Sequence, residues 1–323
     1  MTTKKTALVL GATGGIGGET AAALLRHGWQ VIGMARDPGK RRPPEGTDPL
    51  AGVTWITGDA TNAADVRHAA EGAQVIVHAV NPPGYRGWGK VVLPMIDNTI
   101  AAAKAVGARI VLPGTIYNYG SDAFPTLRED SPQNPKTEKG RIRVELEKRL
   151  EAASQSGVPV VIVRFGDFFG PAAANNWFSQ GLVVPGKKLR AITYPGPKGV
   201  GHAWAFLPDA GETIARLLDR SDELEQFARF HFRGVWDADG TQMVRAIAAG
   251  IGRPRTKVKS LPWFFVGLAG LFNETLRELH KMRYLWRNTI SLDNSKLIAF
   301  LGEEPHTPLP DAVKTTLRAL GVR

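Results

Sequence analysis

Three glycines point most clearly to a chemical function: Gly11, Gly14 and Gly17. They lie between a short apolar run and a stretch rich in alanine and leucine. Glycines spaced in this way allow a tight turn, a close approach of the backbone to a diphosphate, and close helix–strand packing. The helix that follows would offer unpaired N–H groups and a positive dipole end to the phosphates. The pattern therefore predicts a dinucleotide site, and the alternative is a glycine turn without a ligand. The residues predicted to contact the dinucleotide here are Gly11, Thr13, Gly14, Gly15, Ile16 and Gly17.

The residue after the second apolar run distinguishes between the two nicotinamide dinucleotides. An acidic residue there holds a ribose 2′-hydroxyl, whereas an arginine accommodates a 2′-phosphate. Arg36 occupies this place, and the basic residues Lys40, Arg41 and Arg42 follow it. A guanidinium matches the geometry of a phosphate dianion, so we predict NADP(H) as the cofactor with Arg36 at the 2′-phosphate. NAD(H) remains possible through Asp37, and a solvated basic loop is the alternative reading of this segment.

Apolar runs and helical patterns alternate through the first half of the chain. The expected strands are Thr6–Leu10, Val31–Met34, Val53–Thr57, Val75–Val80, Ile110–Leu112 and Val158–Val163. The expected helices are Thr20–Arg26, Ala63–Ala70, Met95–Val106 and Glu138–Ala153. Short strands separated by helices predict βαβ units with right-handed crossovers. The predicted fold is α/β, a doubly wound parallel sheet of the Rossmann type.

The composition changes after Gly170–Pro171, where tryptophan, proline and glycine become more frequent. Beyond this point Asp209 is expected to cap the N-terminus of a helix, and Phe227–Phe232 is expected to be a late strand. We therefore predict a dinucleotide-binding domain over residues 1–170, to which 203–235 returns. A smaller C-terminal substrate-binding region is expected to comprise 171–202 and 236–323.

The composition narrows the class of protein. The 323 residues include no cysteine, which excludes a disulfide framework, a thiolate metal site and a cysteine nucleophile. A cytoplasmic location is expected, and no metal site is predicted. The formal charge of +11 favours an anionic partner, which is nucleic acid, a membrane surface or a phosphorylated small molecule. The absence of a nucleic-acid-binding motif argues against nucleic acid as the main partner. The longest apolar run, Leu261–Phe272, has twelve residues and is too short to span a bilayer.

These patterns together resemble the extended branch of the short-chain dehydrogenase/reductase superfamily, also called the NAD-dependent epimerase/dehydratase family. The glycine spacing matches that family, as does Gly58–Ala60, where the family's aspartate (here Asp59) faces the adenine. The segment His78-Ala79-Val80-Asn81 matches the stretch that lines the cofactor, and Asn98 matches a structural asparagine. Arg164–Pro171 and His202–Asp209 resemble two later family signatures.

The resemblance implies an NAD(P)-dependent oxidoreductase or epimerase-like enzyme. Its substrate would be a small carbonyl or alcohol compound or a nucleotide-linked sugar. The alternative is a non-catalytic NADP(H)-binding protein that acts as a redox sensor or an assembly subunit.

The catalytic positions depart from the family pattern. The family uses a Ser or Thr hydroxyl and a Tyr-x-x-x-Lys motif, in which the phenol exchanges the proton of the substrate alcohol. Matching the segments places Thr115 at the hydroxyl position, Lys139 where the tyrosine is expected, and Arg143 where the lysine is expected. Arg143 could hold the nicotinamide ribose, and a neutral Lys139 amine could serve as the base. The alternatives are that Tyr117 supplies the hydroxyl, or that Lys139 and Arg143 form only a solvated helix face.

The substrate side is expected to be aromatic. The predicted substrate residues are Asn81, Tyr85, Trp88, Trp177 and His202. Their alternative role is packing between the two regions of the chain. The segment Phe264–Arg287 begins apolar and becomes basic, which is typical of packing in the second domain, a lid or an oligomer contact. A membrane-surface helix is a less favoured possibility, and a homodimer is possible.

Overall fold

The computed structural model describes residues 5–40, 48–82, 87–172 and 176–323. Its centre is a parallel sheet in the order β11-β7-β5-β4-β1-β2-β3. The strands are β1 (Thr6–Leu10), β2 (Gln30–Ala35), β3 (Val53–Thr57), β4 (Val75–His78), β5 (Arg109–Gly114), β7 (Val160–Arg164) and β11 (Phe227–His231). The predicted doubly wound fold is confirmed. The strand order reverses between β1 and β4, where ligands of such sheets bind.

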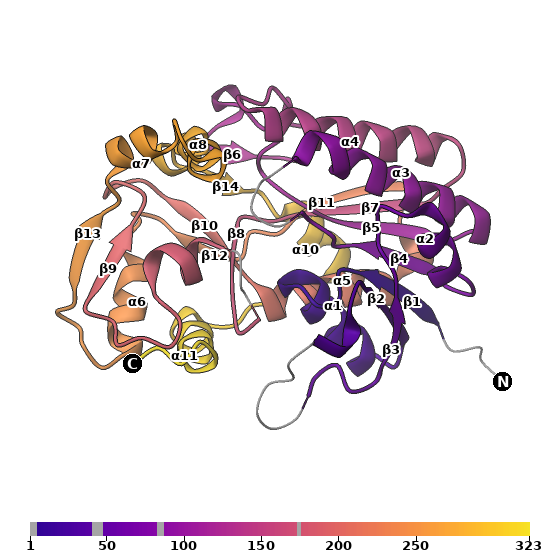
Figure 1. Ribbon diagram of the computed structural model, residues 1–323, viewed down its shortest axis with the longest axis horizontal. Helices are drawn as coiled ribbons and strands as arrows, with labels where there is room; N and C mark the ends of the chain where they lie inside the picture. Colours follow the sequence, from indigo (N-terminus) through magenta and orange to yellow (C-terminus); the bar gives the residue numbers. More distant parts are fainter. Residues whose placement is uncertain (1–4, 41–47, 83–86, 173–175) are drawn as a thin grey trace.

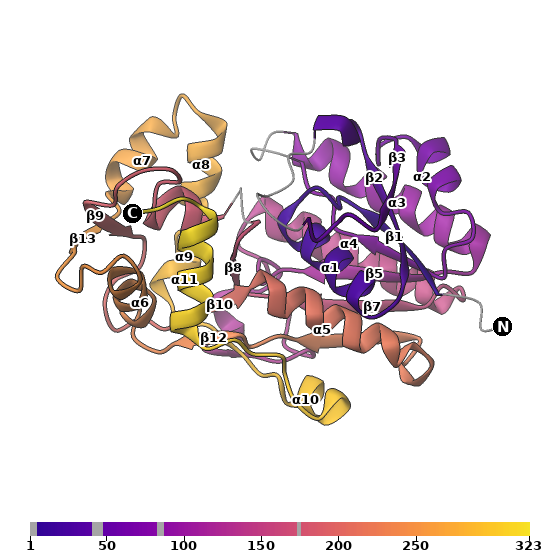
Figure 2. The same cartoon turned by 90° about the horizontal axis from the view of Figure 1, so that it is seen from below.

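Helices cover both faces of this sheet (Figures 1 and 2). On one face lie α1 (Gly15–Arg26) and α5 (Leu207–Asp219), and on the other lie α2 (Ala63–Ala69), α3 (Trp88–Val106) and α4 (Glu138–Gln155). Side chains of β1 alternate between the two cores: Ala7 and Val9 face the first, and Leu8 and Leu10 face the second. This alternation is the period of two that a strand buried on both faces requires.

A second, smaller region packs beside the carboxyl ends of the strands (Figure 1). One of its sheets contains β8 (Asp167–Phe169), β10 (His202–Phe206) and β12 (Val235–Asp237). A second sheet pairs β9 (Ala191–Tyr194) with β13 (Lys257–Ser260), and a third pairs β6 (Thr126–Leu127) with β14 (Ser291–Leu292). Its helices are α6 (Gln242–Gly250), α7 (Trp263–Ala269), α8 (Glu274–Lys281), α9 (Tyr284–Arg287) and α11 (Leu309–Ala319). Helix α10 (Ser295–Leu301) instead packs on the core of the large sheet through Leu297. Short helical turns occupy Pro38–Lys40, Ser121–Ala123, Phe178–Leu182 and Ser221–Glu223. None of the helices in the described ranges is both long and apolar enough to cross a membrane.

Two local expectations were wrong. Asp209 does not cap its helix, because α5 already begins at Leu207, and the Asp209 carboxylate instead accepts hydrogen bonds from the N–H and hydroxyl of Thr307 at 2.7 Å each. The helix expected from Met95 begins at Trp88 and runs through Pro94. Burial of Trp88 and Val92 in the core outweighs the interruption that the proline causes.

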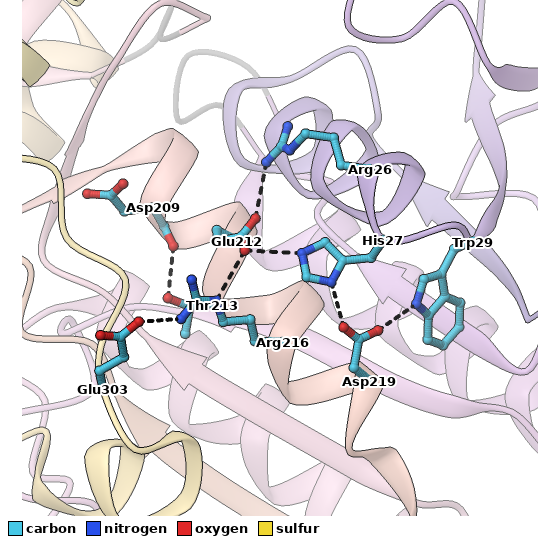
Figure 3. A network of polar contacts seen from close by, with 9 residues as sticks. All are labelled: Arg26, His27, Trp29, Asp209, Glu212, Thr213, Arg216, Asp219 and Glu303. Carbon is cyan, nitrogen blue, oxygen red and sulfur yellow. Dashed lines mark hydrogen bonds and ion pairs between the residues drawn. The ribbon is translucent and has the colours of Figure 1, made fainter.

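A polar network joins α1 to α5 on one face of the sheet (Figure 3). His27 follows the last residue of α1, and its two ring nitrogens lie 2.5 Å from Asp219 and 3.1 Å from Glu212. Asp219 also accepts a hydrogen bond of 3.1 Å from the Trp29 indole. Burial lowers the pKa of His27, but the hydrogen bonds to Asp219 and Glu212 outweigh that effect and raise the pKa overall. The protonated imidazole can donate to both carboxylates at once.

A buried ion pair links α4 to β7. Arg164 is fully buried at the end of β7, and its Nε and Nη2 donate to the two Glu147 carboxylate oxygens at 3.1 and 2.6 Å. Its Nη1 lies 3.1 Å from Nε2 of His231, which ends β11. Burial and the Arg164 charge lower the pKa of His231 to about 3, so this ring is neutral. The guanidinium therefore ties together α4, β7 and β11.

We expect the stability that His27 contributes to depend on pH. Because the folded-state pKa is raised, the contribution is complete below the unfolded value, about 6.5, and is lost as the pH rises through the folded value. Substituting His27→Gln should lower the free energy of unfolding by about 1–2 kcal/mol at pH 6 and by much less at pH 9. Urea denaturation of both proteins at the two pH values measures this difference. An equal loss at both values would contradict the charged network.

Removing one partner of the buried ion pair should be costly. We expect Glu147→Gln to lower the free energy of unfolding by about 3–5 kcal/mol, because Arg164 keeps a buried charge without compensation. The double variant Glu147→Gln/Arg164→Met should recover a large part of that loss. Urea midpoints of the wild type, both single variants and the double variant give the coupling energy. Strictly additive effects would show that the pair does not act as a unit.

Candidate active site

The glycine turn between β1 and α1 needs its glycines for close backbone contacts. Gly11 has a φ of +86°, and a Cβ there would lie 2.7 Å from the carbonyl oxygen of Ala79. A Cβ on Gly17 would lie 2.2 Å from the carbonyl oxygen of Gly11. Side chains at either position would therefore push the turn away from the strand end beside it. The sequence predicted a tight turn and close packing at Gly11 and Gly17, and the geometry agrees with both.

The N-terminus of α1 is open at this turn. Its capping residue Gly14 makes no side-chain capping bond, and Thr13 and Gly14 are exposed while Gly15 and Ile16 are half-buried. Because this turn follows β1 directly, the N-terminus of α1 lies at the edge of the sheet where the strand order reverses. Unpaired N–H groups at a helix N-terminus are donors suited to a diphosphate, so the residues present fit a dinucleotide.

Arg36 and Asp37, the two charged residues expected near the adenosine of a dinucleotide, both lie just after β2. Arg36 is exposed after β2 and lowers the pKa of Asp59 in addition to the main effect, a hydrogen bond from the Thr61 N–H. Asp37 lies in the next turn and pairs with Lys40 at 2.8 Å. Arg41 and Arg42 lie outside the described residues. The Asp37 carboxylate is thus engaged by its own turn, whereas the Arg36 guanidinium faces solvent.

A side chain of α3 fixes the segment after β3. Ala60 is buried, and its carbonyl oxygen accepts a 3.0 Å hydrogen bond from the Asn98 side chain on α3. The Asp59 carboxylate accepts hydrogen bonds from the N–H and hydroxyl of Thr61 at 2.9 and 2.8 Å. These bonds fix the loop beside the predicted adenine position.

The segment after β4 lines the same edge. His78 is buried, and its Nδ1 lies 2.8 Å from the Thr99 hydroxyl. Burial and then the Arg143 charge lower the pKa of His78 to about 3, so the ring is neutral and holds the strand end. The carbonyl group of Ala79 packs against Gly11, as described above. Ala79 and Val80 are both half-buried. Asn81 is exposed and accepts a 3.3 Å hydrogen bond from the Arg143 guanidinium.

Lys139 and Arg143 are buried on α4, which contradicts the reading that they form a solvated helix face. Their exposed fractions are 3% and 7%. Both cations lie over one indole ring: the Lys139 Nζ is 5.6 Å and the Arg143 guanidinium carbon 5.1 Å from the centre of Trp88. An aromatic face attracts cations that have lost their hydration. Trp88 therefore supports the two basic groups from the first residue of α3.

Burial shifts the pKa values of Lys139 and Arg143 away from those of free side chains. Burial lowers the pKa of Lys139 to about 7, although Glu278 and Glu274 of α8 oppose the shift. Burial also lowers the pKa of Arg143, and Tyr117 and Glu147 oppose that change. Tyr117 thus lies within electrostatic reach of Arg143, in the loop after β5. Trp88 thus joins Lys139 to Arg143, and the electrostatic interaction of Arg143 with Tyr117 connects α4 to the loop after β5.

The loop that carries Thr115 and Tyr117 is connected to the buried ion pair. The Thr115 hydroxyl donates to Asn118 at 3.3 Å, Asn118 donates to Gln133 at 3.5 Å, and Gln133 donates to Glu147 at 3.0 Å. The same loop also carries Tyr119, whose hydroxyl lies 3.1 Å from Nε2 of His231, the histidine beside Arg164. Gly140 brings α4 close, since a Cβ there would lie 2.3 Å from the Tyr117 carbonyl oxygen.

Sequence reasoning missed this supporting network. The signal was Arg164, a charged residue at the end of the strand run VVIVR, which must find a buried partner.

The predicted substrate residues divide into two groups. Asn81 and Trp88 both contact Arg143. Trp177 and His202 instead lie in the second region. The His202 ring stacks on Trp286 at 3.8 Å between centroids, and its Nε2 lies 2.8 Å from Asp167. Trp177 meets the same Trp286 edge-on at 5.2 Å. Tyr85 lies outside the described residues.

Two other aromatic residues near these segments, Phe178 and Trp204, are fully buried in the core of the second region. Within the described ranges, no group of three or more histidine, aspartate or glutamate side chains could hold a metal ion.

Comparison with known proteins agrees with this geometry. A family model described as NAD(P)H-binding matches residues 11–177. No curated protein matches the chain. Among solved structures, a chain from Burkholderia cenocepacia J2315 has 18% identity and a TM-score of 0.78, over 99% of this chain and 98% of that one.

Two structures that contain NAD⁺ are also similar. UDP-glucose 4-epimerase from Bifidobacterium longum, in complex with NAD⁺ and UDP, has 16% identity and a TM-score of 0.76 over 98% of both chains. The Bordetella bronchiseptica enzyme WbmH, in complex with NAD⁺, has 21% identity and a TM-score of 0.71, over 99% of this chain and 100% of that one. At these identities the likeness establishes the fold.

The matched residues contain the glycine turn, the cofactor edge of the sheet and α4, and they make up more than half of the chain. The chain therefore belongs to the NAD(P)H-binding family, and it shares its fold with UDP-glucose 4-epimerase and with WbmH.

Proposed function

We propose that the protein is an NAD(P)-dependent oxidoreductase or epimerase-like enzyme that acts at the carbinol or carbonyl carbon of a small substrate. The observation that carries this proposal is the buried pair of Lys139 and Arg143 on one face of α4, supported by Trp88. A bound nicotinamide would supply or accept the hydride. The chain itself must then bind the dinucleotide, orient the substrate oxygen and move one proton.

We assign a residue to each of these steps. The open N-terminus of α1 would bind the diphosphate, and Arg143, held by Asn81, would hold the nicotinamide ribose. Thr115 would orient the substrate oxygen, since its loop is fixed through Asn118. Lys139 would exchange the proton, because a group with a pKa of about 7 is populated in both protonation states near neutral pH. Tyr117 is the alternative proton donor.

For the substrate we propose a compound with an anionic portion, a nucleotide-linked sugar being the leading class. The support is the net charge of +11 and the similarity in fold to an epimerase bound to UDP. Residues 171–202 and 236–323 would form the substrate region, and the buried ring stack of His202 on Trp286 would support it from inside.

A non-catalytic NADP(H)-binding role is the second candidate. The observation that favours it is Lys139 itself, which occupies the place where the resembled family carries its catalytic tyrosine. A protein of this kind would bind the dinucleotide and turn over no substrate.

The cofactor preference should depend on Arg36. We expect NADPH to bind at least about tenfold more tightly than NADH, and Arg36→Ala to remove this preference while leaving NADH binding within about twofold. Titration of each nucleotide, followed by its own fluorescence, gives the dissociation constants. Arg67→Ala on α2 removes an equal charge from an exposed position and serves as the control. Equal binding of both nucleotides by the wild type would remove Arg36 from this role.

The proton transfer should depend on Lys139. With UDP-sugars and small carbonyl compounds as substrates, we expect Lys139→Met to lower kcat by about 10²-fold or more and to leave NADPH binding within about threefold. The wild-type rate should show a titration near pH 7 that the variant lacks. Lys148→Met, an exposed position further along α4, is the matched control.

Three other results separate the alternatives. A full loss in Tyr117→Phe with activity retained in Lys139→Met would transfer the role to Tyr117. Activity retained in both variants would exclude each of them. Tight cofactor binding without turnover of any compound would favour the non-catalytic candidate.

A further inference from the structure

Helix α7 and the turn after it expose an unusual amount of apolar surface. Phe264, Phe265, Leu271 and Phe272 have exposed fractions of 71%, 66%, 70% and 93%, and Leu268 is also exposed. Large contiguous apolar patches on a protein surface mark contacts with another molecule or a membrane. We call these five residues the α7 patch. Figures 1 and 2 show α7 at the outer end of the second region, away from the large sheet.

Four of the five residues of the α7 patch lie close together. The rings of Phe264 and Phe265 lie 5.5 Å apart. Phe264, Leu268 and Leu271 also line one side of a cavity of about 530 Å³ between α7 and the α8–α9 segment. The opposite wall of that cavity includes His280, Arg283 and Arg287. An apolar surface and guanidinium groups therefore meet at one place.

The surroundings of the α7 patch are strongly basic. Residues 251–287 contain eight lysines and arginines but only two acidic residues, Glu274 and Glu278, which gives +6 of the total charge of +11. Lys257 and Lys259 are exposed on β13, next to α7 in the chain. Glu278 is engaged with Lys281 at 2.7 Å. The partner that complements this surface must be apolar at its centre and negatively charged around it.

We propose that the α7 patch docks on the surface of an anionic lipid bilayer. The aromatic side chains would enter the boundary between headgroups and acyl chains, and the surrounding lysines and arginines would contact lipid phosphates. With seven residues, α7 can lie in this boundary but cannot span the bilayer. A symmetric contact between two copies would bring two surfaces of like charge together, which opposes self-association through this patch.

Vesicle flotation tests the proposal on the full chain. We expect binding to vesicles of phosphatidylglycerol and phosphatidylcholine, no binding to phosphatidylcholine alone, and loss of binding at high salt. The variant Phe264→Ser/Phe265→Ser/Phe272→Ser and the variant Lys257→Gln/Lys259→Gln should each lower the bound fraction by about tenfold or more. The matched controls are Ile298→Ser on α10 and Lys104→Gln/Lys148→Gln on α3 and α4, which should bind as the wild type does.

Circular dichroism and NADPH titration of each variant show that it is folded, since all substituted residues are exposed. The absence of wild-type binding to anionic vesicles would overturn the proposal, as would equal binding by the patch variants. A dimer in solution that the phenylalanine variant dissociates, with no vesicle binding, would assign the patch to a second copy instead. None of these outcomes tests the proposed proton transfer, which is assigned to Lys139 or Tyr117 in the other region of the chain.

Discussion

Arg164 is a charged side chain at the end of a strand that is buried on both faces. A buried guanidinium is tolerated only when its donors are matched by a partner charge and by further acceptors. Glu147 supplies the charge from α4, and His231 of β11 occupies the third direction. The same carboxylate receives Gln133, which leads through Asn118 to Thr115. One buried charge thus aligns the sheet, the helix and the loop that carry the candidate catalytic groups.

The second constraint is the close approach of backbone segments at the point where the strand order reverses. Gly11 and Gly17 leave no space for side chains, so the turn lies directly against Ala79 at the end of β4. Parallel strands place all their carboxyl ends at one edge, so the glycine turn lies at the same edge as Asn81, whose side chain accepts a hydrogen bond from Arg143. The topology therefore places the glycine turn and the candidate catalytic residues at one edge of the sheet, although they are far apart in the sequence.

The side chains at the candidate site depart from the pattern of the resembled family. Lys139 and Arg143 share one face of α4, and Trp88 supports both cations. An amine whose pKa burial has lowered can exchange a proton near neutral pH, as a phenol beside a lysine does in the family pattern. The fold therefore does not by itself define the reaction, because the acid–base group is set by a few side chains.

The strand and helix pattern, the glycine turn and the order of the α/β elements could all be read from the sequence, because they depend on local periodicity and on backbone requirements of neighbouring residues. The start of α3 at Trp88 and the contacts of Asp209 could not, since distant residues in the core and Thr307 decide them. The same holds for Lys139: its spacing from Arg143 is local, whereas its burial depends on α3 and α8. The sequence alone determined which groups share a helix face, and only the tertiary structure decided whether water or protein surrounds them, because desolvation depends on every element packed against a side chain.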